Sequence, residues 1–340
     1  MFNIILKKSL SQKYAIAGVS KIISGNTQWS RNVHTPRRAL MYVPSDDKRK
    51  LRKSRELEAD CIALDLEDGV APNKKDVARQ IARAFFDAGS NNPVDGQKEH
   101  RRKSEWAVRV NSVGSGLCEE DLKTVLGGEI KPETILLPKY NNTEQLRQFA
   151  EWVNKALADQ EHKVNLIFYA ESCKSIMRLP ELCEYAVQLS EVSNAKFIPV
   201  GIVFGSDDFC ATIGATRTEE GREILYARQR IVLVAKAFDM QAIDMVYTDY
   251  KNLDGLKAQS KDGARMGYTG KQVIHPCQLE IVQKAFVPSL EKVEWASELL
   301  KAWDAHLKEG VGAFTFKNKM IDAPTMKQAQ NILEIMKSVQ

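Results

Sequence analysis

Eight short apolar segments, each followed by a stretch with helical periodicity, limit the folds open to this chain more than any other feature. Short runs that are apolar on both faces are typical of parallel strands buried between other layers. Eight such alternations over about 240 residues predict a (β/α)₈ TIM barrel of the α/β class. The predicted strands are 39–44, 61–65, 106–111, 134–139, 164–169, a segment within 197–204, 242–247 and 271–275.

An open, doubly wound sheet is the alternative fold for the same alternation. Its commonest dinucleotide-binding signal, G-x-G-x-x-G, is absent after the first predicted strand, which favours the barrel. We assign residues 37–285 to the barrel and residues 286–340 to a C-terminal helical extension, because the chain continues well beyond the eighth strand. Extra segments of this kind often act as lids or contacts between subunits.

The first 33 residues differ in composition from the rest of the chain. Residues 1–45 contain no Asp or Glu, and the basic residues of segment 1–33 account for the whole formal net charge of +5. A basic, Ser-rich segment without acids is typical of a mitochondrial transit peptide, so we expect residues 1–33 to be one and the protein to act in the mitochondrial matrix. A disordered basic tail, or a short helix packed on the body, is the alternative.

The remaining composition argues against several classes of partner. Without the N-terminal bases the chain is electrically neutral, whereas a nucleic-acid surface needs a basic patch, so no nucleic acid is expected. No apolar run approaches about 18 residues, so no membrane span is expected. The six cysteines form no C-x-x-C pair, and their spacing fits no zinc site.

Ionisable side chains follow most of the predicted strands. In a TIM barrel the active site lies at the carboxyl ends of the strands, so we expect these side chains to converge on one rim. The residues are Asp65, Glu67, Asp68, Arg109, Lys139, Glu171, Asp207, Asp208, Asp249 and His275.

Glu171 and Asp208 follow two strands that are neighbours in a barrel. Oxygen ligands without His or Cys suit Mg²⁺ or Mn²⁺, and Mg²⁺ usually takes only one or two protein carboxylates. Taken singly, each acid is more simply interpreted as a cap of the helix that follows it. Only their expected convergence on one rim makes them a candidate metal site.

Other rim residues leave alternatives open. Asp65, Glu67 and Asp68 could bind a metal themselves, hydrogen-bond metal-bound water, or form an acidic surface turn. Arg109 lies inside an apolar strand and should face either a substrate anion or one of these acids, and the two are compatible.

The sequence gives weaker evidence for a function of the basic segment 48–55 and of His275. The bases of segment 48–55, Arg49 and Lys53 among them, could bind the phosphates of a coenzyme A (CoA) thioester, although taken alone they are better explained as a solvated charged face. His275, at the end of the last strand, is more often structural than catalytic in such a place.

Taken together, the motifs resemble the citrate lyase β-subunit family over roughly residues 37–340. Each motif is weak alone, but their order along the chain is specific. The matching segments are 42–44, 64–68, 108–111, 137–139, Glu171, 205–209, 270–276 and 320–324.

The resemblance implies a Mg²⁺-dependent carbon–carbon lyase that cleaves (3S)-citramalyl-CoA to acetyl-CoA and pyruvate. It also implies malate synthase, methylmalate synthase and malyl-CoA thioesterase activities, the first of which uses glyoxylate, and a homotrimer. A malyl-CoA thioesterase or a malate synthase on the same site is the alternative. A non-catalytic CoA- or RNA-binding barrel is a more distant one.

The family's functional residues carry over by motif. Glu171 and Asp208 would bind Mg²⁺, and Asp322 would be the catalytic acid or base, in its own subunit or a neighbouring one. The resemblance assigns substrate binding to Tyr42, Arg49, Lys53, Arg109, Glu171, Ile274 and His275, with Arg109 also catalytic. Two departures stand out. Ser206-Asp207-Asp208 replaces the family's Gly-Glu-Asp, and Arg49 stands where Lys is usual.

Overall fold

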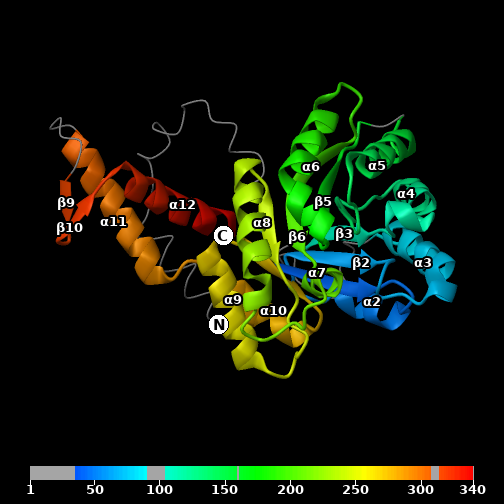
Figure 1. The fold of residues 1–340 in the computed structure, drawn as a ribbon, viewed down its shortest axis with the longest axis horizontal. Helices are drawn as coiled ribbons and strands as arrows, with labels where there is room; N and C mark the ends of the chain where they lie inside the picture. The colour runs from blue at the N-terminus through cyan, green and yellow to red at the C-terminus, as the bar shows by residue number, and fades with distance from the viewer. Residues whose placement is uncertain (1–34, 90–103, 159–160, 308–313, 340) are drawn as a thin grey trace. The chain divides into compact units, whose positions relative to one another are not determined.

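The computed structural model of this chain describes residues 35–89, 104–158, 161–307 and 314–339. Eight parallel strands pair in chain order, and β8 pairs back with β1, so the predicted TIM barrel is confirmed (Figure 1). The expected transit peptide, residues 1–33, lies outside the described residues. The strands are β1 (Ala39–Pro44), β2 (Cys61–Asp65), β3 (Glu105–Arg109), β4 (Thr134–Leu137), β5 (Val164–Ala170), β6 (Phe197–Phe204), β7 (Gln241–Asp244) and β8 (Gly270–Val273).

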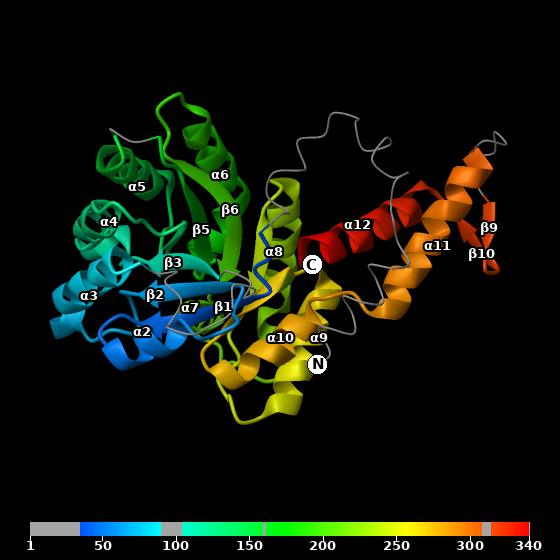
Figure 2. The same cartoon turned by 180° about the vertical axis from the view of Figure 1, so that it is seen from behind.

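Helices follow the strands and surround the barrel, as the views from the front and from behind both show (Figures 1 and 2). Side-chain caps begin several of them: Ser172 caps α6 and Asn142 caps α5. The helices of the barrel are α2 (Lys48–Ser54), α3 (Lys75–Asp87), α4 (Cys118–Leu126), α5 (Thr143–Ala156), α6 (Cys173–Glu191), α7 (Ser206–Ile213), α8 (Leu225–Ala237), α9 (Leu253–Met266) and α10 (Leu279–Ala285).

Alternation along the strands divides the apolar side chains into two cores. One set fills the barrel interior, with Leu40, Ala107, Leu136 and Ile167 among its members. The other set lies between the strands and the helices and is much larger. Residues at the ends of the inward-facing rows therefore meet at the two openings of the barrel.

A buried ion pair fills the amino end of the barrel. The Arg37 guanidinium donates to both carboxylate oxygens of Glu105, at 2.5 and 2.6 Å, and to Gln241 at 3.3 Å. Thr134 also donates to Glu105. These side chains are at least nine-tenths buried, so this end of the barrel is closed by polar groups that satisfy one another.

Four strands end earlier than predicted: β3 at Arg109, β8 at Val273, and also β4 and β7, for which the cause is visible. β4 ends at Leu137, before Pro138, which has no N–H to donate. β7 ends at Asp244, because the N–H of Met245 bonds the Asp244 carboxylate at 2.9 Å instead of a neighbouring strand. Asp249, which follows the predicted seventh strand, lies in the loop after β7.

The C-terminal extension has its own small core. Helices α11 (Leu290–Leu307) and α12 (Ala323–Val339) pack together, and the strands β9 (Phe314–Phe316) and β10 (Lys319–Ile321) lie between them in the sequence. Ala296, Leu299 and Ala329 are fully buried in this core. Among the described residues, no helix is long and apolar enough to cross a membrane.

Candidate active site

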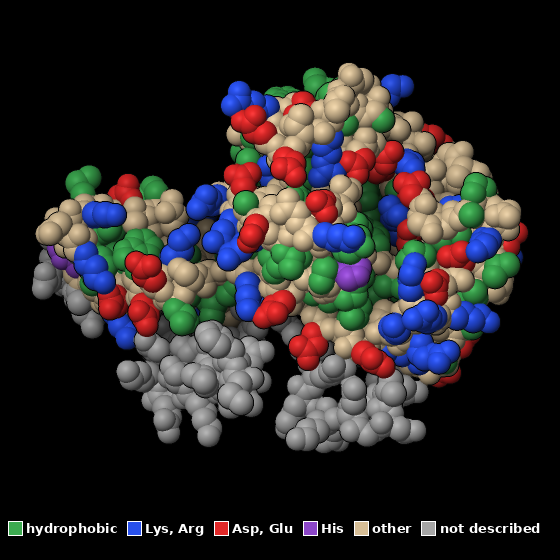
Figure 3. Space-filling view, turned by 90° about the horizontal axis from the view of Figure 1, so that it is seen from below, with side chains coloured by type: hydrophobic (Ala, Val, Ile, Leu, Met, Phe, Trp, Pro, Cys, Tyr) green, Lys and Arg blue, Asp and Glu red, His purple; other side chains and the backbone are tan. Residues whose placement is uncertain are grey.

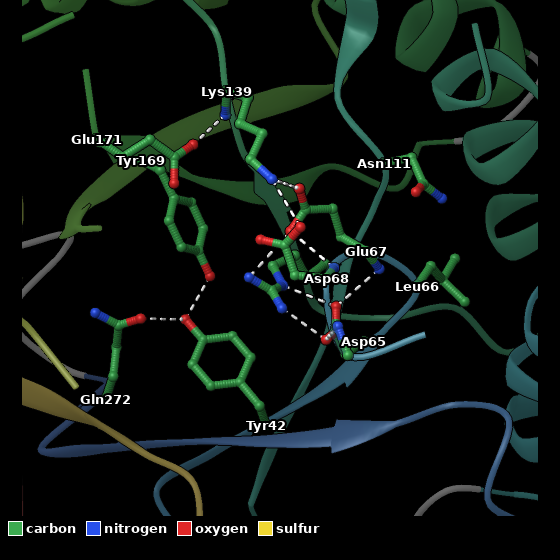
Figure 4. A network of polar contacts seen from close by, with 12 residues as sticks. Tyr42, Asp65, Leu66, Glu67, Asp68, Asn111, Lys139, Tyr169, Glu171 and Gln272 are labelled. Atoms are coloured by element: carbon green, nitrogen blue, oxygen red, sulfur yellow. Dashed lines mark hydrogen bonds and ion pairs between the residues drawn. The ribbon is translucent and has the colours of Figure 1, made fainter. Parts of the chain in front are cut away.

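Glu171 directly follows β5 and is 5% exposed. Its Oε1 accepts a hydrogen bond from the backbone N–H of Lys139, and Ser172, not Glu171, caps the next helix (Figure 4). Burial raises the pKa of Glu171 to about 8; the Lys139 N–H opposes this, whereas the charges of Asp208 and Glu67 add to it. The helix-cap interpretation of Glu171 is therefore wrong, and its buried carboxylate has another role.

Gly205 makes the space that Glu171 occupies. A Cβ atom on Gly205 would lie 2.5 Å from the Cβ of Glu171 and 2.7 Å from its Oε2. Gly205 ends the loop between β6 and α7, so its missing side chain lets the two strand ends approach closely.

Asp208 lies in the first turn of α7, which follows β6, the neighbour of β5. It is half-buried, and it is close enough to Glu171 for its charge to raise the pKa of that carboxyl. The preceding acid, Asp207, is exposed and pairs instead with Arg217 at 2.5 Å. Glu171 and Asp208 thus follow neighbouring strands at the carboxyl end of the barrel and lie close enough to interact electrostatically, whereas Asp207 pairs with Arg217. Their sharing of a metal ion stays a prediction.

These two carboxylates suit a hard divalent cation. Among the described residues, no group of three or more His, Cys, Asp or Glu side chains could hold a metal. A pair of oxygen donors, one of them buried and pushed toward protonation, is a donor set that Mg²⁺ can complete with water or substrate oxygens.

Arg109 ends β3 and makes a fork-to-fork pair with Asp65. Its Nε and Nη2 donate to the two Asp65 oxygens at 2.7 and 2.6 Å, and its Nη1 lies 3.2 Å from Glu67 Oε2. The prediction that Arg109 pairs with a neighbouring acid is confirmed. Of the five N–H groups of a guanidinium, these contacts use three, so one hydrogen on each Nη remains for a substrate oxygen.

The acidic turn after β2 is held by Lys139. The Lys139 ammonium donates to Glu67 Oε1 at 2.5 Å and to Asp68 Oδ1 at 2.7 Å. The Asp65 carboxylate also accepts the N–H groups of Glu67 and Gly69, both at 2.9 Å. The turn is thus a bonded part of the site wall, and a loose acidic surface turn is excluded.

A directional hydrogen-bond chain supports Arg109 from the other side. The amide nitrogen of Gln272 donates to the carbonyls of Phe204 and Asp244, at 2.8 and 3.2 Å, so its oxygen must be the acceptor for the Tyr42 hydroxyl at 3.1 Å. Because Tyr42 has then given its only proton, Tyr169 must be the donor in the Tyr42–Tyr169 pair.

The ring of Tyr42 lies 4.9 Å from the Arg109 guanidinium carbon, close enough for a cation–π contact. Because the Tyr42 hydroxyl donates its proton to Gln272, Tyr42 offers a substrate at the rim its ring and an acceptor oxygen, but no donor.

The residues expected at the CoA thioester lie on two segments of the rim. Arg49 and Lys53 are exposed on α2, which Asp47 caps. Ile274 and His275 are exposed just after β8, and the His275 ring accepts the Cys277 N–H at 3.2 Å and stacks on Tyr250. This supports a structural role for His275 without testing a binding one. Figure 3 shows a dense group of Lys and Arg side chains on an otherwise mixed surface.

Asp322 caps α12. Its carboxylate accepts the Thr325 N–H at 3.1 Å and the Thr325 hydroxyl at 2.7 Å, and these hydrogen bonds lower its pKa. It is fully exposed. No described contact joins it to the rim residues, so its assignment as acid or base stays a prediction.

Sequence reasoning missed three members of the site: Tyr169, Gln272 and Gly205. The signal for Tyr169 was available, because Ile167, Tyr169 and Glu171 share one face of β5. No comparable signal identified Gln272 or Gly205 as site residues, since each depends on contacts with other strands: Gln272 with the ends of β6 and β7, and Gly205 with Glu171 after β5.

Comparison with known proteins gives a consistent result. The model of the HpcH/HpaI aldolase/citrate lyase family matches residues 38–276. The chain is 42% identical over 320 residues to the mitochondrial citramalyl-CoA lyase of Rattus norvegicus, covering 93% of this chain and 90% of the rat protein. It is 43% identical over 318 residues to the Homo sapiens protein of the same name, with the same two coverages.

Solved structures agree with the fold. The CitE protein of Mycobacterium tuberculosis, crystallised with magnesium, acetoacetate and coenzyme A, has a TM-score of 0.67 and 28% identity, covering 89% of this chain and 99% of that one. The citrate lyase beta subunit from M. tuberculosis, complexed with oxaloacetate and magnesium, has a TM-score of 0.57 and 27% identity, covering 76% and 100%.

Proposed function

This chain belongs to the HpcH/HpaI aldolase/citrate lyase family and is a carbon–carbon lyase, and from that premise we propose that it cleaves (3S)-citramalyl-CoA to acetyl-CoA and pyruvate with Mg²⁺. The observation that carries the proposal is that Glu171 and Asp208 follow the neighbouring strands β5 and β6, close enough for the charge of Asp208 to raise the pKa of Glu171. The names of the mammalian relatives support this substrate, and the magnesium in the bacterial structures supports the metal.

Glu171 and Asp208 would hold the ion. When bound, Mg²⁺ would act as a Lewis acid that polarises the substrate's oxygen atoms and keeps them in place. Lys139 keeps one oxygen of Glu171 engaged through its N–H, and Gly205 lets the carboxylate stay close to α7. The protein thus preorganises its ligands before substrate arrives.

Cleavage breaks the bond between the CH₂ beside the thioester and the carbon that carries the hydroxyl. The hydroxyl proton leaves, that carbon becomes the keto carbon of pyruvate, and the electron pair passes to the acetyl-CoA enolate, which then takes up a proton. Arg109 would offset the developing negative charge with its remaining Nη hydrogens. Asp322 would move the proton.

Asp65 and the Tyr42 ring would fix the guanidinium of Arg109 for this task. Arg49, Lys53, Ile274 and His275 would line the path of the CoA moiety. We further propose that the N-terminal segment directs the protein to the mitochondrial matrix, as in the mammalian relatives' name, and that the protein forms a homotrimer.

The test is a Mg²⁺-dependent assay on purified protein. Pyruvate release from (3S)-citramalyl-CoA should disappear after EDTA treatment and return with added Mg²⁺. Comparing kcat/KM for malyl-CoA, and for condensation with glyoxylate and with pyruvate, separates this activity from the thioesterase and malate synthase alternatives.

Two variants locate the metal. Glu171→Gln should lose both Mg²⁺ binding and turnover, whereas Glu181→Gln, at an exposed glutamate on the surface of α6, should keep both. Undiminished turnover in EDTA would reject the proposal.

A further inference from the structure

Lys139 has a backbone conformation that is unusual for its residue type. Its φ is +51°, in the left-handed region that a residue with a Cβ adopts at a cost. The other non-glycine residues with positive φ in the described chain are Asp239, in the turn before β7, and Lys317 and Asn318, in the turn between β9 and β10. Strain of this kind persists where surrounding contacts fix it, often at functional sites.

This φ lets the N–H of Lys139 face Glu171 while its side chain points to another part of the site. β4 has ended at Leu137, so the Lys139 N–H is free of the sheet, and it donates to Glu171 Oε1 (Figure 4). With the N–H held on Glu171, an extended φ would point the Cβ and the chain after Lys139 in another direction, so the N–H and the side chain could not keep both of their contacts. Glu171 is 5% exposed, so the loss of this donor would be costly.

The side chain of the same residue reaches the other half of the site. Its ammonium contacts Glu67 at 2.5 Å and Asp68 at 2.7 Å, and Glu67 in turn lies 3.2 Å from Arg109 Nη1. Lys139 therefore touches the candidate metal ligand through its backbone and the arginine's partner through its side chain.

We propose that Lys139 is a positioning residue with two separable functions. Its left-handed backbone orients Glu171 for the divalent cation, and its ammonium holds Glu67 against Arg109. This inference rests on the proposed function, because it assumes that Glu171 binds the metal.

The two functions can be separated by variants that all lack the ammonium. Glycine adopts positive φ freely and asparagine tolerates it, whereas valine, which is β-branched, strongly disfavours it. Mg²⁺ affinity measured by titration calorimetry should therefore be at least tenfold weaker in Lys139→Val than in Lys139→Gly. Lys139→Asn should behave like Lys139→Gly, and circular dichroism would verify that each variant is folded.

The ammonium is tested by comparing Lys139→Gly with the wild type. Mg²⁺ affinity should change by less than about threefold, while kcat/KM for the acyl-CoA should fall at least tenfold, because Glu67 and Arg109 lose a common support. A general loss of structure would instead lower Mg²⁺ affinity and kcat/KM together.

Equal Mg²⁺ affinity in Lys139→Gly and Lys139→Val, with the wild type binding Mg²⁺, would overturn the inference and leave the proposed function standing. A wild type that binds no Mg²⁺ would instead reject the proposed function, and this inference with it. If Lys139→Val fails to fold, the nearly isosteric variants Lys139→Leu and Lys139→Asn are compared instead. Equal Mg²⁺ affinities of these two variants would also overturn the inference.

Discussion

Adding a single methyl group at Gly205 should disable the metal site. The Cβ of alanine at 205 would lie 2.5 Å from the Cβ of Glu171, whereas carbon atoms pack at about 3.5–4.0 Å. Both Cβ atoms are fixed to their backbones, so no rotamer change relieves the overlap, and one strand end must shift by about 1 Å. The φ of Gly205 is −84°, which any residue adopts, so space alone decides the outcome.

Overpacking of this kind costs about 1–3 kcal/mol. If that cost falls on the position of Glu171, Mg²⁺ affinity should drop by about 5–150-fold, since about 1.4 kcal/mol is a factor of ten. A displacement of about 1 Å can also lower turnover by about a hundredfold. Calorimetric titration of Mg²⁺ into metal-free protein measures the first effect, and steady-state pyruvate release measures the second.

Gly114→Ala is the matched control. It also replaces a glycine near the rim by alanine, but the nearest atom to the new Cβ is Gln145 Nε2 at 3.7 Å, an ordinary contact. Thermal melts in EDTA would show that both variants fold. If Gly205→Ala binds Mg²⁺ as tightly as Gly114→Ala, the close approach of Gly205 and Glu171 does not affect Mg²⁺ binding and the reasoning is wrong.

Three further predictions concern protonation and the support of Arg109. Because burial raises the pKa of metal-free Glu171 to about 8, its contribution to stability is present below its ordinary pKa and is lost as pH rises through about 8. Mg²⁺ affinity should rise as pH approaches about 8, because Glu171 loses its proton there. The pH dependence of stability should vanish in Glu171→Gln. Tyr42→Phe leaves Gln272 without its donor and should cost about 1–3 kcal/mol in unfolding free energy. The phenylalanine of Tyr42→Phe keeps an aromatic ring over Arg109, whereas the leucine of Tyr42→Leu does not. We therefore expect a lower kcat/KM for Tyr42→Leu than for Tyr42→Phe, and the reverse order would contradict the cation–π contact. Asp322→Asn should lower kcat by about 10²–10⁴-fold at unchanged KM, and an unaltered kcat would remove Asp322 from the mechanism.

The barrel was predictable because its signals are local. Each apolar run and each helical period can be recognised within a dozen residues, and the rule that active sites lie at the carboxyl ends of barrel strands placed Glu171, Asp208 and Arg109 on one rim. The strand ends were less predictable from apolar content, because Pro138 ends β4 by lacking an N–H and the Asp244 carboxylate ends β7 by accepting the next N–H.

The detailed chemistry of the site was beyond local reasoning. Gly205 matters only because Glu171 lies beside it, and Gln272 only because its amide meets two carbonyls from other strands. Asp322 is a helix cap by every local signal and by its described contacts. Its catalytic assignment comes from family resemblance alone.

The sealed amino end of the barrel has a kinetic consequence. With Arg37, Glu105 and Gln241 filling that end, a reactant can enter or leave only past the carboxyl ends of the strands. Both fragments of a cleaved thioester must then depart by the route through which the intact molecule arrived. We therefore expect the two products, the small keto acid and the long nucleotide-bearing thioester, to leave one after the other through the same opening.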